Sequence, residues 1–250
     1  MTAAPAIRQV SSPNHGERAP GKPVDMIILH YTGMDSGERA LRWLCDPESG
    51  VSSHYFVFED GRICQLVDES RRAWHAGTSL WEGESDINSR SIGIEIANPG
   101  YEFGYQPFPD TQIAATIALC LDILARHPVA PHHVLAHSDV APLRKNDPGE
   151  LFPWRRLFEA GVGLWVPPEP ITISAPATTL RRGEHGEEVA ALRVGLARYG
   201  YGLGPGDEYD VLTEAVVRAF QRHFRPERVD GAADASTMKT LDRLLEMRRK

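Results

Sequence analysis

The sequence predicts an α/β fold, with helices flanking a mixed central sheet, followed by a small C-terminal domain of three helices. In the first two thirds of the chain, strand-like apolar runs alternate with segments of helical spacing. The last third contains helical patterns joined by turns with Gly and Asp. A stretch with four prolines separates the two parts and favours an extended connector between separate hydrophobic cores. We therefore predict three regions, residues 1–162, the connector 163–177 and residues 178–250.

Apolar runs and period-two alternation predict the strands of the first region. The segment VDMIILHY at 24–31 is apolar on both faces, which is typical of a central strand covered from both sides. Glu59, Asp60 and Gly61 separate two strand-like runs and predict a hairpin. The predicted strands are 24–31, 53–58, 62–67, 92–97 and 133–137, and the predicted helices are 37–45, 110–127 and 153–160.

Composition and charge narrow the classes of function. The 250 residues are 42% apolar and 24% charged, which is ordinary for a folded soluble protein. The net charge of −7 divides into −8 for residues 1–177 and +1 for residues 178–250. An acidic main domain argues against a nucleic-acid partner. No apolar window approaches the length of a membrane span, so none is expected.

The N-terminal residues and the cysteines bear on the cellular compartment. Residues 1–25 lack the apolar core of a secretory signal. Cys45, Cys64 and Cys120 are odd in number and have no CxxC spacing, which indicates free thiols in a reducing compartment. We therefore expect a cytoplasmic protein, with a periplasmic or envelope location as the alternative. The sequence does not determine the oligomeric state.

Two histidines and one aspartate form a candidate metal site. His30 ends the predicted central strand, His137 closes another strand, and Asp147 follows ten residues later before Pro148. Two imidazoles and one carboxylate suit catalytic Zn²⁺, because three protein ligands leave the fourth tetrahedral position open. The alternative has equal weight on residue chemistry alone: His137 would cap a polar loop, and Asp147 would belong to an Asp-Pro turn.

Glu95 and Lys145 are candidate catalytic residues. In SIGIEIAN, alternation places Glu95 on the face opposite to the neighbouring isoleucines, beside small residues that leave room for a substrate. A carboxylate in a strand core is costly unless it is paired or reacts, although an edge-strand glutamate facing water remains the alternative. Lys145 lies two residues before Asp147, where a cation could stabilise an oxyanion or merely form an ion pair with Asp147.

Four motifs in order carry a resemblance to a known family. The motifs are ILHYT, SSHYFVFEDGRICQLVDESRRAWHAG, NSRSIGIEIAN and AHSDVAPLRKNDPG, and the match runs over residues 24–158. Together they resemble the zinc-dependent N-acetylmuramoyl-L-alanine amidases of the second amidase family, relatives of the peptidoglycan recognition proteins. The resemblance implies cleavage of the amide bond between N-acetylmuramic or anhydro-muramic acid and L-alanine in peptidoglycan fragments. It also implies the residue roles: His30, His137 and Asp147 bind zinc, Glu95 is the acid/base residue, and Lys145 assists at the oxyanion.

The C-terminal region resembles the three-helix peptidoglycan-binding domain that some of these amidases carry. The resemblance lies in LRRGEHGEEVAALRVGLARYGY, LTEAVVRAFQRHF and VDGAADASTMKTL. Arg193 stands where the family usually has Gln, and DEYD at 207–210 departs from its usual turn. Intact peptidoglycan is therefore a candidate partner besides small muropeptides, and a purely structural role for this domain is the alternative.

Trp74, His75 and Trp81 are candidate substrate contacts. Aromatic faces suit sugar rings, and a loop histidine can hydrogen-bond a peptide carboxylate, although packing explains a Trp between small residues as well.

Two other functions remain open. One is a binding module that recognises muropeptides without cleaving them, and the other is a zinc endopeptidase acting within the stem peptide, although the HExxH motif is absent.

Overall fold

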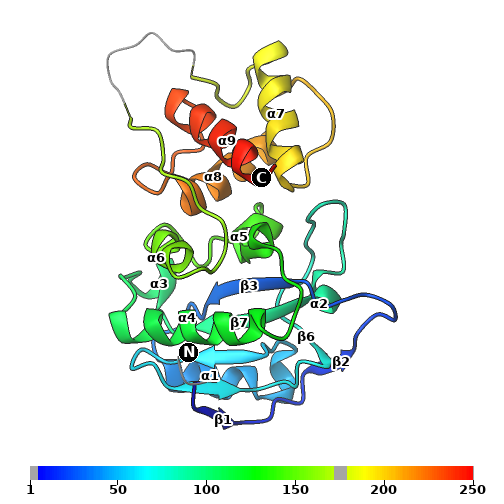
Figure 1. The fold of residues 1–250 in the computed structure, drawn as a ribbon, viewed down its shortest axis with the longest axis vertical. Coiled ribbons are helices and arrows are strands. Elements are labelled where there is room, and N and C mark those ends of the chain that lie inside the picture. The colour runs from blue at the N-terminus through cyan, green and yellow to red at the C-terminus, as the bar shows by residue number, and fades with distance from the viewer. Residues whose placement is uncertain (1–4, 172–178, 250) are drawn as a thin grey trace.

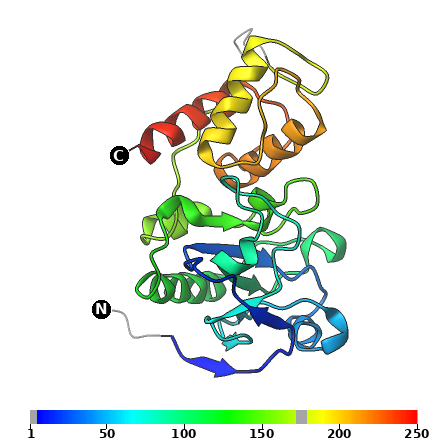
Figure 2. The ribbon, with the colours of Figure 1, turned by 90° about the vertical axis from the view of Figure 1, so that its right-hand side faces the viewer.

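The computed structural model describes residues 5–171 and 179–249, so residues 172–177 of the predicted connector and the start of the third region lie outside the described residues. It confirms a mixed α/β domain followed by three helices, which stack on one side of that domain (Figures 1 and 2). Within these described ranges, no helix is both long and apolar enough to cross a membrane.

The central sheet of the described residues has six strands in the order β1-β5-β4-β7-β3-β8. β4 and β5 are antiparallel and joined by the predicted hairpin, whereas the other neighbouring pairs are parallel. A separate antiparallel pair consists of β2 and β6. The bounds are β1 Ile7–Gln9, β2 His15–Glu17, β3 Met26–Tyr31, β4 Tyr55–Val57, β5 Ile63–Gln65, β6 Arg71–Ala73, β7 Ser91–Ile96 and β8 Val134–Ala136.

Helices cover both faces of this sheet, as the continuous apolar run of β3 predicts. α4 packs on one face with Ile27 and Leu29, and α5 lies over the opposite face, toward which Met26 and Ile28 point. α1 covers the same face as α5, over β4 and β5. The helices of this domain are α1 Gly37–Leu44, α2 Ile87–Arg90, α3 Gly100–Phe103, α4 Asp110–Leu124, α5 His137–Val140 and α6 Trp154–Glu159, with short 3-10 turns at Pro47–Ser49 and Pro131–His133.

The C-terminal domain consists of α7 Glu187–Tyr199, α8 Val211–Phe224 and α9 Ala235–Arg248. Aspartates begin the last two helices: Asp210 accepts a hydrogen bond from the Thr213 N–H, and Asp234 accepts one from the Thr237 N–H. Such caps satisfy backbone donors that the first helical turn leaves free.

The expectation of separate cores is wrong. One cluster of buried side chains combines Ile28, Trp81 and Val140 of the α/β domain with Tyr201 and Phe224 of the helical domain. Trp81 has no exposed surface, and its ring meets those of Tyr199 and Tyr201 edge to face. A proline-rich connector shows only that the chain is extended there. Whether the joined domains dock depends on apolar faces that lie far apart in sequence.

Candidate metal centre and active site

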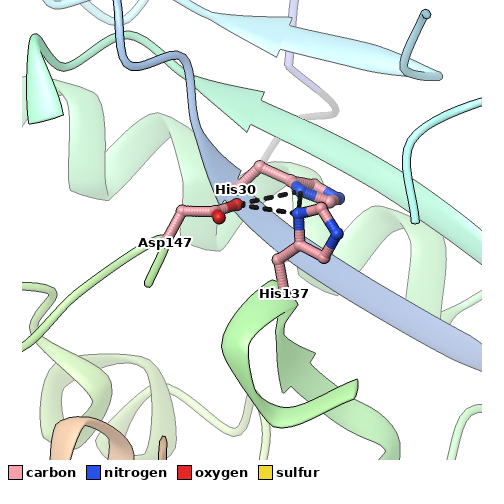
Figure 3. Close-up of side chains that lie close together, drawn as sticks. All are labelled: His30, His137 and Asp147. Carbon is pink, nitrogen blue, oxygen red and sulfur yellow. Dashed lines mark hydrogen bonds and ion pairs between the residues drawn. The ribbon is translucent and has the colours of Figure 1, made fainter. Parts of the chain in front are cut away.

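His30, His137 and Asp147 come from three segments and meet at one point (Figure 3). His30 lies near the end of β3, and His137 is the first residue of α5, directly after β8. Because β3 and β8 are parallel neighbours, both histidines stand at the same edge of the sheet. Asp147 lies in the loop between α5 and α6, and all three side chains are buried.

The three potential ligand atoms form a nearly equilateral triangle. His30 Nδ1 lies 2.9 Å from His137 Nδ1 and 3.1 Å from Asp147 Oδ2, and His137 Nδ1 lies 3.1 Å from the same carboxylate oxygen. A tetrahedral zinc ion with bonds of about 2.0 Å separates its ligands by roughly 3.3 Å. The observed spacing is close to this value, so the triangle fits a small tetrahedral cation.

The hydrogen bonds of His137 identify the nitrogen that is free to bind a metal. His137 Nε2 lies 3.1 Å from the carbonyl oxygen of Ala76, which can only accept a hydrogen bond. The proton of the neutral ring is therefore on Nε2. Nδ1, the atom that faces Asp147, keeps its lone pair for a cation.

A longer relay sets the tautomer of His30. The Ser91 hydroxyl donates to the Ile87 carbonyl at 2.7 Å and thus accepts from His75 Nε2, which lies 3.2 Å away. His75 Nδ1 then carries no proton and accepts from His30 Nε2 at 3.1 Å. This leaves the lone pair of His30 Nδ1 pointing at the other two ligands, which is how partners behind a metal-binding histidine orient it.

The charges of the ligand set also suit a divalent cation. Burial, followed by the proximity of His137, lowers the pKa of His30 to about 4, so the ring is neutral at neutral pH. Burial opposes ionisation of Asp147, but His137 and His30 outweigh it and hold the pKa of this carboxyl well below its usual range. Two imidazoles and one carboxylate converge here, and such a set leaves one tetrahedral position for water on a bound zinc ion.

Glu95 stands beside this triangle. It pairs in register with His30 across β7 and β3, so both side chains leave the same face of the sheet. Its Oε2 is buried and has no hydrogen-bond partner among the described residues. Burial, and then the negative charge of Asp147, raises the pKa of Glu95 well above its usual value. A carboxyl that is shifted in this way and faces a cleft is suited to proton transfer.

Lys145 lines the same cleft. The positive charge of Lys145 favours the ionised carboxylate of Glu95. It therefore lowers the pKa of Glu95 and offsets part of the rise that burial and Asp147 cause. Within residues 5–171 and 179–249, Lys145 forms no ion pair with Asp147. The ammonium group is thus available to a negative charge that forms in the cleft.

The cleft that contains these groups has a volume of about 510 Å³ and lies between α1, the end of β3 and the loop after α5. Its walls combine aromatic rings with charged groups, including Tyr31, Trp43, Trp74, Tyr101, Glu102 and Arg144. Aromatic rings offer flat apolar surfaces to sugar rings, and the charged groups can bind polar parts of a substrate.

The three candidate substrate contacts take different places. Trp74 lines the cleft, where its ring is accessible to a ligand. His75 also borders the cleft but is buried, and both of its ring nitrogens are engaged by His30 and Ser91. Trp81 is fully buried against the C-terminal domain and is not among the described residues that line the cleft.

Sequence reasoning missed the position of His75 behind His30 and its dependence on Gly93. A Cβ atom at Gly93 would lie 2.4 Å from Cγ of His75, so the ring occupies the space that this glycine leaves. The small residue two positions before Glu95 was visible in SIGIEIAN. The contact between Gly93 and His75 was not visible, because it joins segments that are distant in sequence.

Three side chains that could hold a metal ion stand beside a carboxylate whose Oε2 has no partner among the described residues. Metal-dependent hydrolases use this arrangement to attack amide bonds, so the fold and the site point to the class of hydrolases. The family follows from comparison with known sequences. The chain belongs to the N-acetylmuramoyl-L-alanine amidase family, which it matches over residues 20–150. Residues 185–241 match a family described as a peptidoglycan binding domain. The protein is thus an amidase that hydrolyses the bond between N-acetylmuramic acid and L-alanine.

Three similarities illustrate the relationship. The chain is 40% identical to the N-acetylmuramoyl-L-alanine amidase AmiD of Escherichia coli (strain K12), over 89% of this chain and 83% of AmiD. It resembles the structure of E. coli AmiD in complex with anhydro-N-acetylmuramic acid-L-Ala-D-γ-Glu-L-Lys, with a TM-score of 0.77, 39% identity and coverage of 92% and 93% of the two chains. It also resembles AmpDh3 of Pseudomonas aeruginosa in complex with anhydromuramic pentapeptide, with a TM-score of 0.72, 31% identity and coverage of 95% and 98%.

Proposed function

We propose that this amidase uses a zinc ion held by His30, His137 and Asp147. The observation that supports this most directly is the triangle of three unprotonated donor atoms at 2.9 to 3.1 Å. Without a cation, three electron pairs would face one another in a buried site, which is unfavourable. The chemistry of the donors, two imidazoles and a carboxylate, matches catalytic zinc.

The protein residues then divide the hydrolysis between them. When bound, zinc supplies Lewis acidity, which lowers the pKa of water and polarises the carbonyl of the amide. Glu95 accepts a proton from the attacking water at its carboxylate and donates it to the departing alanine nitrogen. Lys145 stabilises the negative charge that forms on the carbonyl oxygen. Water and the amide thus become a carboxylic acid on the sugar and a free amine on the peptide.

We further propose that the substrates are muropeptides, including fragments with an anhydro sugar. Both structures of relatives described above contain an anhydromuramic peptide. The cleft of this chain offers Trp43, Trp74 and Tyr101 for packing against a sugar or a peptide backbone, and Arg144 for a carboxylate. Intact peptidoglycan is a further proposed ligand, for which residues 185–241 provide the matching domain.

Mass spectrometry of the products tests this function. Incubation of the zinc-loaded protein with an anhydromuramic tripeptide should release a tripeptide with a free L-alanine amino terminus. Glu95→Gln, which keeps the size of the side chain, is the matched control and should yield almost no product. Cleavage within the peptide would instead identify an endopeptidase, and binding without cleavage by the parent protein would refute hydrolysis.

For the compartment, we propose the cytoplasm, where muropeptides from wall turnover are recycled. The three cysteines are free, and Cys64 and Cys120 are buried thiols that suit a reducing environment. Fractionation of cells that express the gene from its native start tests this. Activity in the cytosolic fraction is expected, whereas activity in the periplasmic or membrane fraction would refute the cytoplasmic assignment.

A further inference from the structure

A buried carboxylate links the metal centre to the C-terminal domain. Asp139 lies in α5, two residues after His137, and is only 1% exposed. Its Oδ2 accepts hydrogen bonds from the Ala136 N–H at 2.8 Å and from His223 Nδ1 at 2.7 Å. Its Oδ1 accepts one from the Tyr201 hydroxyl at 2.7 Å. Two of these three donors therefore belong to the helical domain.

The donors are themselves held in place. The ring of His223 is stacked between Trp154 of α6, with ring centres 3.7 Å apart, and Phe224, at 3.9 Å. The ring of Tyr201 packs edge to face against Trp81, at 5.1 Å. His223 and Tyr201 thus both lie at the interface between the two domains. Because a buried carboxylate is costly unless donors surround it, the position of Asp139 depends on the docked helical domain.

The carboxylate in turn shapes the segment that carries a metal ligand. By accepting from the Ala136 N–H, Asp139 closes the turn that leads from β8 into α5, where His137 is the first residue. The backbone N–H of Ser138, the residue after His137, donates to the carbonyl of Asp147 at 3.0 Å. The turn therefore holds one ligand directly and is tied to the backbone of a second.

We propose that Tyr201 and His223 are positioning residues for the metal centre, and that the C-terminal domain holds His137 in place through Asp139. This inference rests on the ligand set of the proposed function. It assigns the domain a role in the cleavage of small fragments, in addition to any contact with the cell wall. Neither Tyr201 nor His223 lies among the described residues that line the cleft, so they act through the turn rather than on the substrate.

Tyr201→Phe in the full chain tests the proposal, with Tyr209→Phe as the matched control. Both tyrosines are buried in the helical domain, and each loses one hydroxyl hydrogen bond of 2.7 Å. The bond of Tyr209 goes to the carbonyl of Gly231, inside the domain and away from α5. The measurements are zinc affinity, by competition with a chromogenic chelator, thermal stability, and kcat and KM on an anhydromuramic tripeptide.

We expect Tyr201→Phe to weaken zinc binding by about tenfold, the lower end of the effect of partners behind metal ligands. It should lower kcat and leave KM nearly unchanged, whereas Tyr209→Phe should reduce only thermal stability. In an Asp139→Ala background, adding Tyr201→Phe should change zinc affinity little further, because both act through one contact. Unchanged zinc affinity in Tyr201→Phe, or equal weakening in Tyr209→Phe, would overturn the proposal. Failure of the parent protein to bind zinc would instead refute the proposed ligand set.

Discussion

At the scale of single residues, the site depends on which nitrogen of each histidine carries the proton. The carbonyl of Ala76 keeps the proton of His137 on Nε2, and the relay through His75 does the same for His30. Lone pairs are thus directed at the proposed metal position. Glu95 differs from these residues, since its Oε2 has no partner among the described residues, which agrees with its proposed role in proton transfer.

Replacing Glu95 by Gln should separate proton transfer from folding and metal binding. The amide has the size of the carboxyl but cannot accept the proton of water. We expect normal thermal stability and zinc content with a loss in kcat of about a hundredfold or more, the usual size of a general acid/base contribution. Steady-state kinetics and elemental analysis measure both quantities, and near-normal turnover would place the proton transfer elsewhere.

Gly93 should tolerate no side chain. An added Cβ would lie 2.4 Å from the ring of His75, so the ring must move and His30 loses its partner. We expect Gly93→Ala to cost about 1 to 3 kcal/mol of stability and to weaken zinc binding. Gly16→Ala is the control, because its Cβ would meet only Trp74 Nε1, at an ordinary 3.8 Å. Equal zinc affinity and equal melting temperatures for the two variants would contradict the relay.

At the scale of elements, parallel strands position the residues of the candidate site, and helices pack against the sheet. The register of β3 and β7 sets His30 opposite Glu95, and the end of β8 adds His137. On the other face, the end of α4 is fastened to the sheet by Glu69. This carboxylate accepts hydrogen bonds from Tyr55 of β4 at 2.7 Å and from Arg126 and His127 after α4.

The Glu69 cluster predicts a pH dependence of stability. Burial opposes its ionisation, but hydrogen bonds from Arg126, Tyr55 and His127 lower the pKa of Glu69 to about 2. A carboxyl whose pKa is lowered by folding stabilises the fold at every pH above its pKa in the unfolded chain. This contribution is lost as the pH falls from about 4.5 to about 2. Glu69→Gln should thus cost about 1 kcal/mol at pH 7, a modest value for a partly solvated charge.

Thermal unfolding of the parent protein and Glu69→Gln across this pH range measures the effect. The difference between their melting temperatures should be largest near neutral pH and should shrink below pH 4.5. Glu59→Gln is a control outside this cluster. A difference that stays constant down to pH 2 would show that the ionised Glu69 does not contribute.

At the scale of the whole molecule, the two domains share buried surface. We propose that residues 1–162 and 178–250 are two domains joined by the connector 163–177. Buried side chains of the two domains nevertheless form one cluster. An ion pair between Glu82 and Arg248 joins the α/β domain to the last helix. The same Glu82 lies near His132 and His133 in a second group with metal-binding side chains. Arg248 already pairs with this carboxylate, so we expect one zinc per chain.

Deleting residues 171–250 should destabilise the α/β domain. Trp81 and Val140 are fully or almost fully buried in the shared cluster and would meet water, and each such side chain stabilises the fold by about 1.5 to 3 kcal/mol. We expect a fall in melting temperature of about 10 °C or more, together with self-association. Calorimetry and light scattering measure these changes. If the truncated protein had the same melting temperature as the full chain, the shared cluster would add no stability.

Much of the fold could be predicted because its signals are local. All five predicted strands overlap observed ones, and 110–127 contains α4 Asp110–Leu124. β1, β2 and β6 were missed, since strands of only three residues, most of whose side chains are exposed or partly exposed, leave no clear alternation. The expectation of separate cores was wrong, because proline content describes the connector and not the faces that it joins.

The sequence by itself determined the kinds of residue in the site and their places at strand ends, because alternation and ligand chemistry depend on neighbours along the chain. His30, Glu95 and His137 are visible in this way. Only the tertiary structure decided which side chains stand behind them. His75 supports His30, and Tyr201 reaches Asp139 from 62 residues away. Such partners are chosen by the packing of distant segments, for which a single sequence carries no local signal.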